Sequence, residues 1–195
     1  SDTLGNGWTE RNGDAVINAA CAAGGTSAGA EVGAENRNGT HWIQRTLSTS
    51  AGNPLCPAAG CRSIELRYCR STTPDGGGPP PNATYIDNND TFASRVRDAG
   101  GAYQPDVAGE CPGWDENIWR NNRCTVDYNR AMTCVTLPLS DAWAANNANF
   151  GIQFEVRRDR QVGEDMCVDE VVVETKPTDI DTGSVAVQDP PVAVS

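Results

Sequence analysis

Histidine and lysine are nearly absent from this sequence, and their scarcity limits the chemistry that it can perform. The one histidine is His41, and a Ser-His-Asp or Cys-His catalytic apparatus needs a histidine. His41 lies beside Trp42 in a predicted strand, where a lone histidine is more often structural than catalytic. Of the 15 basic residues Lys176 alone is a lysine, and a GC-rich genome explains this preference for arginine more simply than a functional need does.

Long apolar runs and Cys-x-x-Cys pairs are missing as well. No run of about 18 apolar residues could cross a bilayer, and no charged-then-apolar leader opens the chain, so we expect Ser1 to be a mature N-terminus left after removal of a signal peptide. The 26 acidic residues and the net charge of −11 repel phosphate backbones and anionic lipids. The expected partners therefore include no nucleic acid, and no membrane span is predicted.

Cysteine is abundant, and its even number predicts four disulfides in an oxidising compartment. The eight residues are Cys21, Cys56, Cys61, Cys69, Cys111, Cys124, Cys134 and Cys167. Pairing of Cys111 with Cys124 would close a loop, pairing of Cys56 with Cys61 would close the turn "CPAAGC", and pairing of Cys69 with Cys134 would tie two strands. Other connectivities stay open. The absence of Cys-x-x-Cys argues against zinc ribbons and thioredoxin-like chemistry.

Three sequons also fit a secreted protein located outside the cell or at its surface. Asn38, Asn82 and Asn89 each begin an Asn-x-Thr triplet that could accept a glycan. Such triplets often arise by chance, so the sequence does not decide whether the protein is a glycoprotein.

Short β-rich runs dominate the rest of the chain. "HWIQRTLS" alternates Trp42 and Gln44 against Ile43 and Arg45, the period of two that places one face on a core. Similar runs are "SIELRYC", "TFASRVRD", "MTCVTLPL", "NFGIQFEVRRD" and "MCVDEVVVET". Helical evidence is thin, because the alanine-rich run 14–23 meets glycines at once. The pattern predicts an all-β fold, a two-sheet antiparallel β-sandwich or jelly roll over residues 1–175, with an extended tail at 176–195.

Two long insertions, 71–90 and 101–124, interrupt the strands. The second contains Tyr103, Trp114 and Trp119, and sugar rings stack on exposed aromatic faces. These three residues are therefore candidates for binding a polysaccharide. An equally good alternative is that they cap one end of the sandwich, because a long ordered loop needs core of its own.

The order of several motifs resembles secreted jelly-roll modules of the galactose-binding-like and MAM-like type. The motifs are "GNGWTERNGDAVI", "THWIQRTLSTSAG", "VTLPLSDAWAANNANFGIQFEV" and "EDMCVDEVVVE", within residues 4–175. In some such modules a structural calcium ion joins the first strand to the last, and this resemblance implies Glu10 and Asp169 as calcium ligands. The alternative is that these acids solvate a sheet face or pair with arginine.

Catalysis has weak support in the sequence. A glycosidase needs only two carboxylates at a suitable separation. Nominal candidates are Glu31 with Glu35, and Glu164 with Asp165 and Asp169. Such pairs arise by chance among 26 acidic residues, so we predict that the protein is not an enzyme.

The tail ends in "VAVQDPPVAVS", with two valine-bearing triplets around a proline pair. A tail of this composition could be a linker, a cover over its own sandwich, or a strand that is added to a neighbouring copy. Val185, Val187, Val192 and Val194 would then be the assembly residues, and head-to-tail addition would form a filament. The sequence thus predicts a non-catalytic extracellular subunit of a homopolymeric filament or surface layer. The alternative is a carbohydrate-binding or cell-adhesion module, stabilised by calcium.

Overall fold

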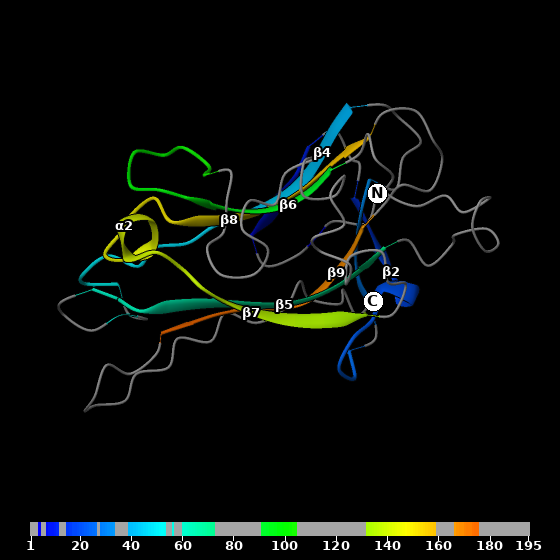
Figure 1. The fold of residues 1–195 in the computed structure, drawn as a ribbon, viewed down its shortest axis with the longest axis horizontal. Helices are drawn as coiled ribbons and strands as arrows, with labels where there is room; N and C mark the ends of the chain where they lie inside the picture. Colours follow the sequence, from blue (N-terminus) through cyan, green and yellow to red (C-terminus); the bar gives the residue numbers. More distant parts are fainter. Residues whose placement is uncertain are drawn as a thin grey trace.

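A computed structural model describes residues 4, 7–11, 15–26, 28–33, 39–53, 56, 60–72, 91–104, 132–158 and 166–175. Within these ranges the chain forms two antiparallel sheets that face each other (Figure 1). The helices of the same ranges are too short or too polar to cross a membrane.

The four-stranded sheet has the order β1-β4-β8-β6, and the five-stranded sheet has the order β2-β3-β9-β5-β7. The first contains β1 (Trp8–Glu10), β4 (Gly39–Thr46), β8 (Gly151–Arg158) and β6 (Thr91–Arg97). The second contains β2 (Ala15–Asn18), β3 (Gly29–Val32), β9 (Met166–Thr175), β5 (Ile64–Thr72) and β7 (Thr133–Pro138). Two short helices, η1 (Ala19–Cys21) and α2 (Asp141–Ala144), connect strands. The all-β, two-sheet antiparallel sandwich predicted from the sequence is confirmed.

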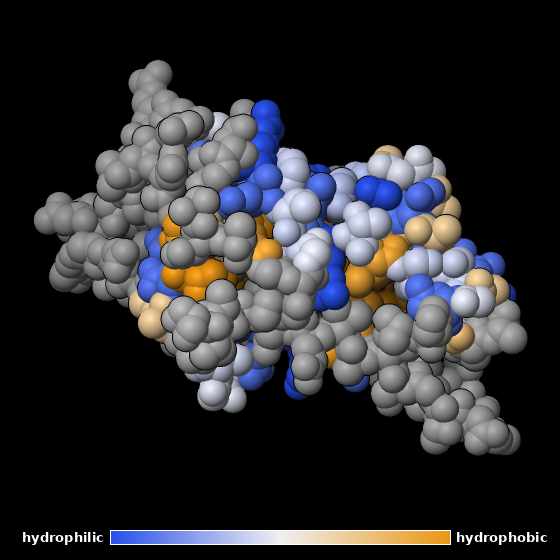
Figure 2. Space-filling view, turned by 180° about the vertical axis from the view of Figure 1, so that it is seen from behind, coloured by the Kyte–Doolittle hydropathy of each residue, from blue (hydrophilic) through white to orange (hydrophobic). Residues whose placement is uncertain are grey.

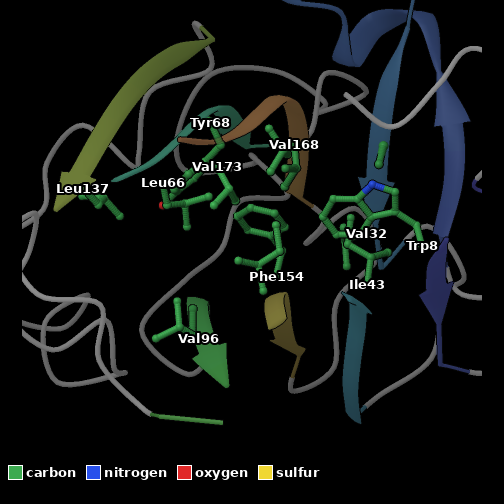
Figure 3. Close-up of a cluster of buried hydrophobic side chains, with 14 of the residues drawn as sticks. Trp8, Val32, Ile43, Leu66, Tyr68, Val96, Leu137, Phe154, Val168 and Val173 are labelled. Atoms are coloured by element: carbon green, nitrogen blue, oxygen red, sulfur yellow. The ribbon is translucent and has the colours of Figure 1, made fainter. Parts of the chain in front are cut away.

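Alternation along the strands produces the core, because inward side chains from both sheets meet between the layers. Phe154 on β8 lies at its centre and is fully buried. Its ring stacks at 6.1 Å on Trp8 and lies at 4.9 Å from the tilted ring of Tyr68. Apolar residues from β3, β4, β5, β6, β7 and β9 surround these rings (Figure 3).

A buried polar chain also bridges the two sheets. The guanidinium of Arg70 on β5 donates to the Tyr68 hydroxyl at 2.9 Å, and this hydroxyl lies 3.1 Å from the Ser94 hydroxyl on β6. Arg70 and Ser94 are 2% and 0% exposed. Buried polar groups of this kind are stable when they are hydrogen-bonded, and here the bonds fix one sheet against the other.

Residues 15–23 of the alanine-rich run form a short strand followed by one 3-10 turn and not an α-helix. Residues Ala15–Asn18 pair with β3 as strand β2. Asn18 then caps η1, since its side-chain oxygen accepts from the Ala20 amide at 2.9 Å. Gly24 and Gly25 follow with φ of 55° and 97°, which glycine adopts readily. Sheet pairing has therefore outweighed the high helix propensity of the alanines.

Three disulfides join the described residues. Cys56 pairs with Cys61 and Cys69 pairs with Cys134, two of the pairings that the sequence leaves open. The third bridge, between Cys21 and Cys167, was not predicted and closes 146 residues, which restricts the unfolded chain by on the order of 5 kcal/mol. This bridge fixes η1 to the side of β9 that points away from the core. Cys111 and Cys124 lie outside the described residues.

Candidate functional site

The strongest candidate site is the outward surface of the four-stranded sheet, called here the outer face. Along β4, His41 and Ile43 are buried between the sheets, and the alternate residues Trp42 and Gln44 are half-buried on the other side. The register places Trp42 opposite Glu155 and Gln44 opposite Gln153. The outer face is made of Trp42, Gln44, Arg95, Tyr103, Gln153 and Glu155.

Two side-chain pairs organise the centre of the outer face. The Gln153 amide donates to the Gln44 side-chain oxygen at 3.3 Å, and Gln153 is only 6% exposed. Arg95 on β6 donates to Glu155 at 2.9 Å, with exposed side-chain fractions of 25% and 18%. The Nε–H group of Arg95 is buried and has no hydrogen-bond partner. The strip thus presents amide, guanidinium and carboxylate groups in fixed positions.

Tyr103 closes one end of this strip. It pairs with Arg97 through an isolated β-bridge, after a turn in which Asp98 accepts from the Ala102 amide at 3.0 Å. A Cβ atom added to Gly151 would lie 3.2 Å from the Tyr103 hydroxyl, so the glycine makes room for the ring. This hydroxyl is buried near the Arg97 guanidinium, and no group among the described residues accepts a hydrogen bond from it. Burial raises the pKa of Tyr103, although the nearby Arg97 charge lowers it in part.

The chemistry of the outer face suits a polyhydroxylated ligand. An indole ring offers a flat apolar surface for the C–H face of a sugar, and neighbouring amide and charged groups can donate to or accept from vicinal hydroxyls. Within the described ranges, no group accepts a hydrogen bond from the Arg95 Nε–H or from the Tyr103 hydroxyl. Sequence alternation places Trp42 and Gln44 on one face of their strand. The sequence holds no signal for their cross-strand partners, because the pairing of two strands cannot be read from either strand alone.

The predicted binding residues are divided between described and undescribed segments. Tyr103 is at the end of the outer face, whereas Trp114 and Trp119 lie outside the described residues. The valines of the tail, Val185, Val187, Val192 and Val194, and the sequon residues Asn38, Asn82 and Asn89 also lie outside them.

The two expected calcium ligands occupy different sheets. Glu10 on β1 accepts from the Ala15 amide at 2.8 Å. Asp169 on β9 is fully buried, and its Oδ2 atom accepts from the Ala23 amide at 2.6 Å and from the Thr26 hydroxyl. Its Oδ1 atom is buried without a hydrogen-bond partner. The described residues therefore do not bring Glu10 and Asp169 together, but they leave one Asp169 oxygen available.

Another group of potential metal ligands combines Cys69, Cys134 and Glu170, whose ligand atoms lie within 4.8 Å of one another. The two sulfurs form a disulfide, so neither is a thiolate that could bind a metal. In this state the group offers carboxylate oxygens alone.

The candidate catalytic groups are not assembled by the described residues. His41 is 2% exposed, between the sheets. Glu31 is 5% exposed and accepts from the Asn18 amide at 2.6 Å, while Glu35, Glu164 and Asp165 lie outside the described residues. Viewed from behind, the described residues show hydrophilic surface around apolar patches (Figure 2).

No protein-family model, curated protein or solved structure matches this chain.

Proposed function

We propose that this chain is an extracellular, non-catalytic carbohydrate-binding module and that its outer face contacts a neutral polysaccharide. The observation that carries the proposal is the placement of Trp42 beside the Gln44–Gln153 amide pair and the Arg95–Glu155 ion pair. A flat ring next to fixed donors and acceptors is the arrangement that sugar recognition requires. The three disulfides support an oxidising, extracellular compartment.

The charge of the chain favours a neutral ligand. A net charge of −11 repels polyanions at long range. On the outer face Arg95 is compensated by Glu155, so the face offers no excess of positive charge at that position to attract an acidic polysaccharide. Hydrogen bonds to hydroxyls and stacking on Trp42 would supply the affinity instead.

The test is affinity electrophoresis through gels that contain individual neutral polysaccharides. We expect the wild type to be retarded by at least one of them. Trp42→Ala should weaken binding about tenfold, which corresponds to about 1.4 kcal/mol. Thr136→Ala is the control, because Thr136 is exposed on β7 of the other sheet. Retardation of Trp42→Ala equal to that of the wild type would overturn the assignment, provided that its thermal midpoint is preserved.

A filament subunit is the second candidate function, and it is supported by the sheet edges. Among the described strands, β7 pairs with β5 alone and β6 pairs with β8 alone. Each could accept an added strand such as the valine-bearing tail of a neighbouring copy. Deletion of residues 177–195 should then leave a folded monomer that no longer assembles. Unchanged assembly in electron micrographs would exclude the tail as the donor.

Calcium is retained as a proposed structural ligand at Asp169. The Oδ1 atom, which has no hydrogen-bond partner among the described residues, is the oxygen that would bind. Calcium would hold the 23–26 loop against β9. Because calcium prefers six to eight oxygens, backbone carbonyls or water would complete its shell.

A further inference from the structure

The three described disulfides differ in their accessibility to solvent. Cys21 and Cys167 are both fully buried, and Cys61 is 2% exposed. Cys134 is an exposed residue of the edge strand β7, whereas its partner Cys69 is fully buried on β5. A soluble thiol would therefore reach the Cys69–Cys134 bridge most easily, and it would attack the Cys134 sulfur.

A carboxylate lies directly against the buried half of this bridge. Oε2 of Glu170 is 3.4 Å from the Cys69 sulfur. A disulfide sulfur carries no proton, so this approach is a contact between an anion and sulfur and not a hydrogen bond. The other oxygen, Oε1, lies over Gly24, where an added Cβ would be only 1.4 Å away. Glu170 is thus held between the 23–26 loop and the disulfide.

A β-bulge places Glu170 in this position. The register between β5 and β9 shifts between Arg67 and Cys69, and two residues of β9, Glu170 and Val171, face one residue of β5. Glu170 has φ of 49°, a left-handed conformation that is unfavourable for a non-glycine residue. Glycine or asparagine would adopt it more easily, so the glutamate side chain is retained at a position where the backbone disfavours it.

We propose that Glu170 protects the Cys69–Cys134 disulfide from exchange with thiols. In the exchange step an external thiolate attacks the Cys134 sulfur and forms a mixed disulfide, the Cys69–Cys134 bond breaks, and Cys69 leaves as a thiolate. That negative charge develops 3.4 Å from the Glu170 carboxylate. Like charges at this distance repel strongly, so the leaving thiolate and the transition state are destabilised.

The protection has a structural consequence for the sandwich. The bridge ties the edge strand β7 to β5 at two directly paired residues. A second thiolate would complete reduction by releasing Cys134 and forming the disulfide of the reductant, after which β7 would depend on its sheet hydrogen bonds and on the packing of Leu137 in the core. Glu170 thereby keeps an exposed bridge closed in surroundings that contain small thiols.

The test compares reduction rates of the full chain with dithiothreitol at neutral pH and low ionic strength. The readout is alkylation of Cys134, quantified by peptide mass spectrometry. Glu170→Gln and Glu170→Asn both remove the charge, and asparagine also tolerates the left-handed backbone. We expect both variants to react about threefold to tenfold faster than the wild type.

Glu174→Gln is the matched control. It removes the same charge from the same strand, but its register partner on β5 is Glu65, four residues before Cys69. Its rate should equal that of the wild type. Equal acceleration of this control would show an effect of net charge and overturn the proposal. If Glu170→Asn is reduced faster but Glu170→Gln is not, easier access of the thiol and not loss of charge explains the rate, and the proposal is refuted. Unchanged reduction rates in both variants would refute the proposal as well.

Discussion

Replacing Asp169 by alanine should detach the 23–26 loop from the side of β9 that points away from the core. The carboxylate accepts from the Ala23 amide at 2.6 Å and from the Thr26 hydroxyl, although it lies 146 residues away from Ala23. Hydrogen bonds to a charged group contribute about 1.5–3 kcal/mol each, while relief of a buried charge offsets part of that loss. We therefore expect a loss of about 3 kcal/mol, which lowers the thermal midpoint by on the order of 10 °C.

Asp169→Asn provides the comparison for this prediction. An asparagine oxygen in the place of Oδ2 can still accept from both donors, so this variant should lose about 1 kcal/mol or less. Thermal unfolding gives the two midpoints, and hydrogen exchange of the Ala23 amide reports loop detachment directly. An alanine variant within about 0.5 kcal/mol of the wild type, with the Ala23 amide still protected, would refute the reasoning.

The same two proteins test calcium. If the ion binds at Oδ1 of Asp169, a chelator should lower the thermal midpoint of the wild type, and Asp169→Asn should no longer respond. A wild-type midpoint that does not change with chelator would remove Asp169 as a calcium ligand.

Two further predictions concern glycine spacing and pH. Gly29→Ala should destabilise the fold by about 1–3 kcal/mol in denaturant titrations, because the added Cβ would lie 2.3 Å from the Cys21 carbonyl oxygen; wild-type stability would contradict this. Since the pKa of Tyr103 is raised in the folded protein, the unfolded chain loses that proton first, and stability should fall as the pH rises above about 10. Tyr103→Phe should remove that component, and identical pH curves for the two proteins would argue against a buried hydroxyl.

Alternating side chains made most of the sandwich predictable. Strands β4 to β9 fall on runs in which apolar and polar residues alternate, because every second residue of each strand points into the core. Strands β2 and β3 have only four residues each, which is too short to show a period of two. The pairing of β3 with β9 joins segments that are remote in the sequence.

The disulfides also differ in how far the sequence indicates their pairing. Cys56 and Cys61 are near neighbours, and Cys69 and Cys134 lie in two strands that the sequence indicates. The Cys21–Cys167 bridge depends on η1 folding back over β9, where Gly29 leaves room for the Cys21 carbonyl. The spacing of the cysteines in the sequence does not indicate the Cys21–Cys167 pairing.

The candidate site was only partly visible in the sequence. Tyr103 was selected as an aromatic residue of a long loop, and Trp42 and Gln44 share a face by alternation. Arg95 and Glu155 become neighbours because β6 and β8 pair in one register, and a shift of β6 by one residue would send Arg95 to the core. The outer face is therefore a property of the tertiary pairing.

Chemical-shift mapping tests the outer face most directly. The isotope-labelled chain would be titrated with oligosaccharides of whichever neutral polysaccharide retards it in electrophoresis. The account predicts that the largest shifts fall on the indole N–H of Trp42, the side-chain amides of Gln44 and Gln153, and the backbone of β4, β8 and β6. Shifts confined to other segments, or the absence of saturable shifts with every neutral oligosaccharide, would contradict it.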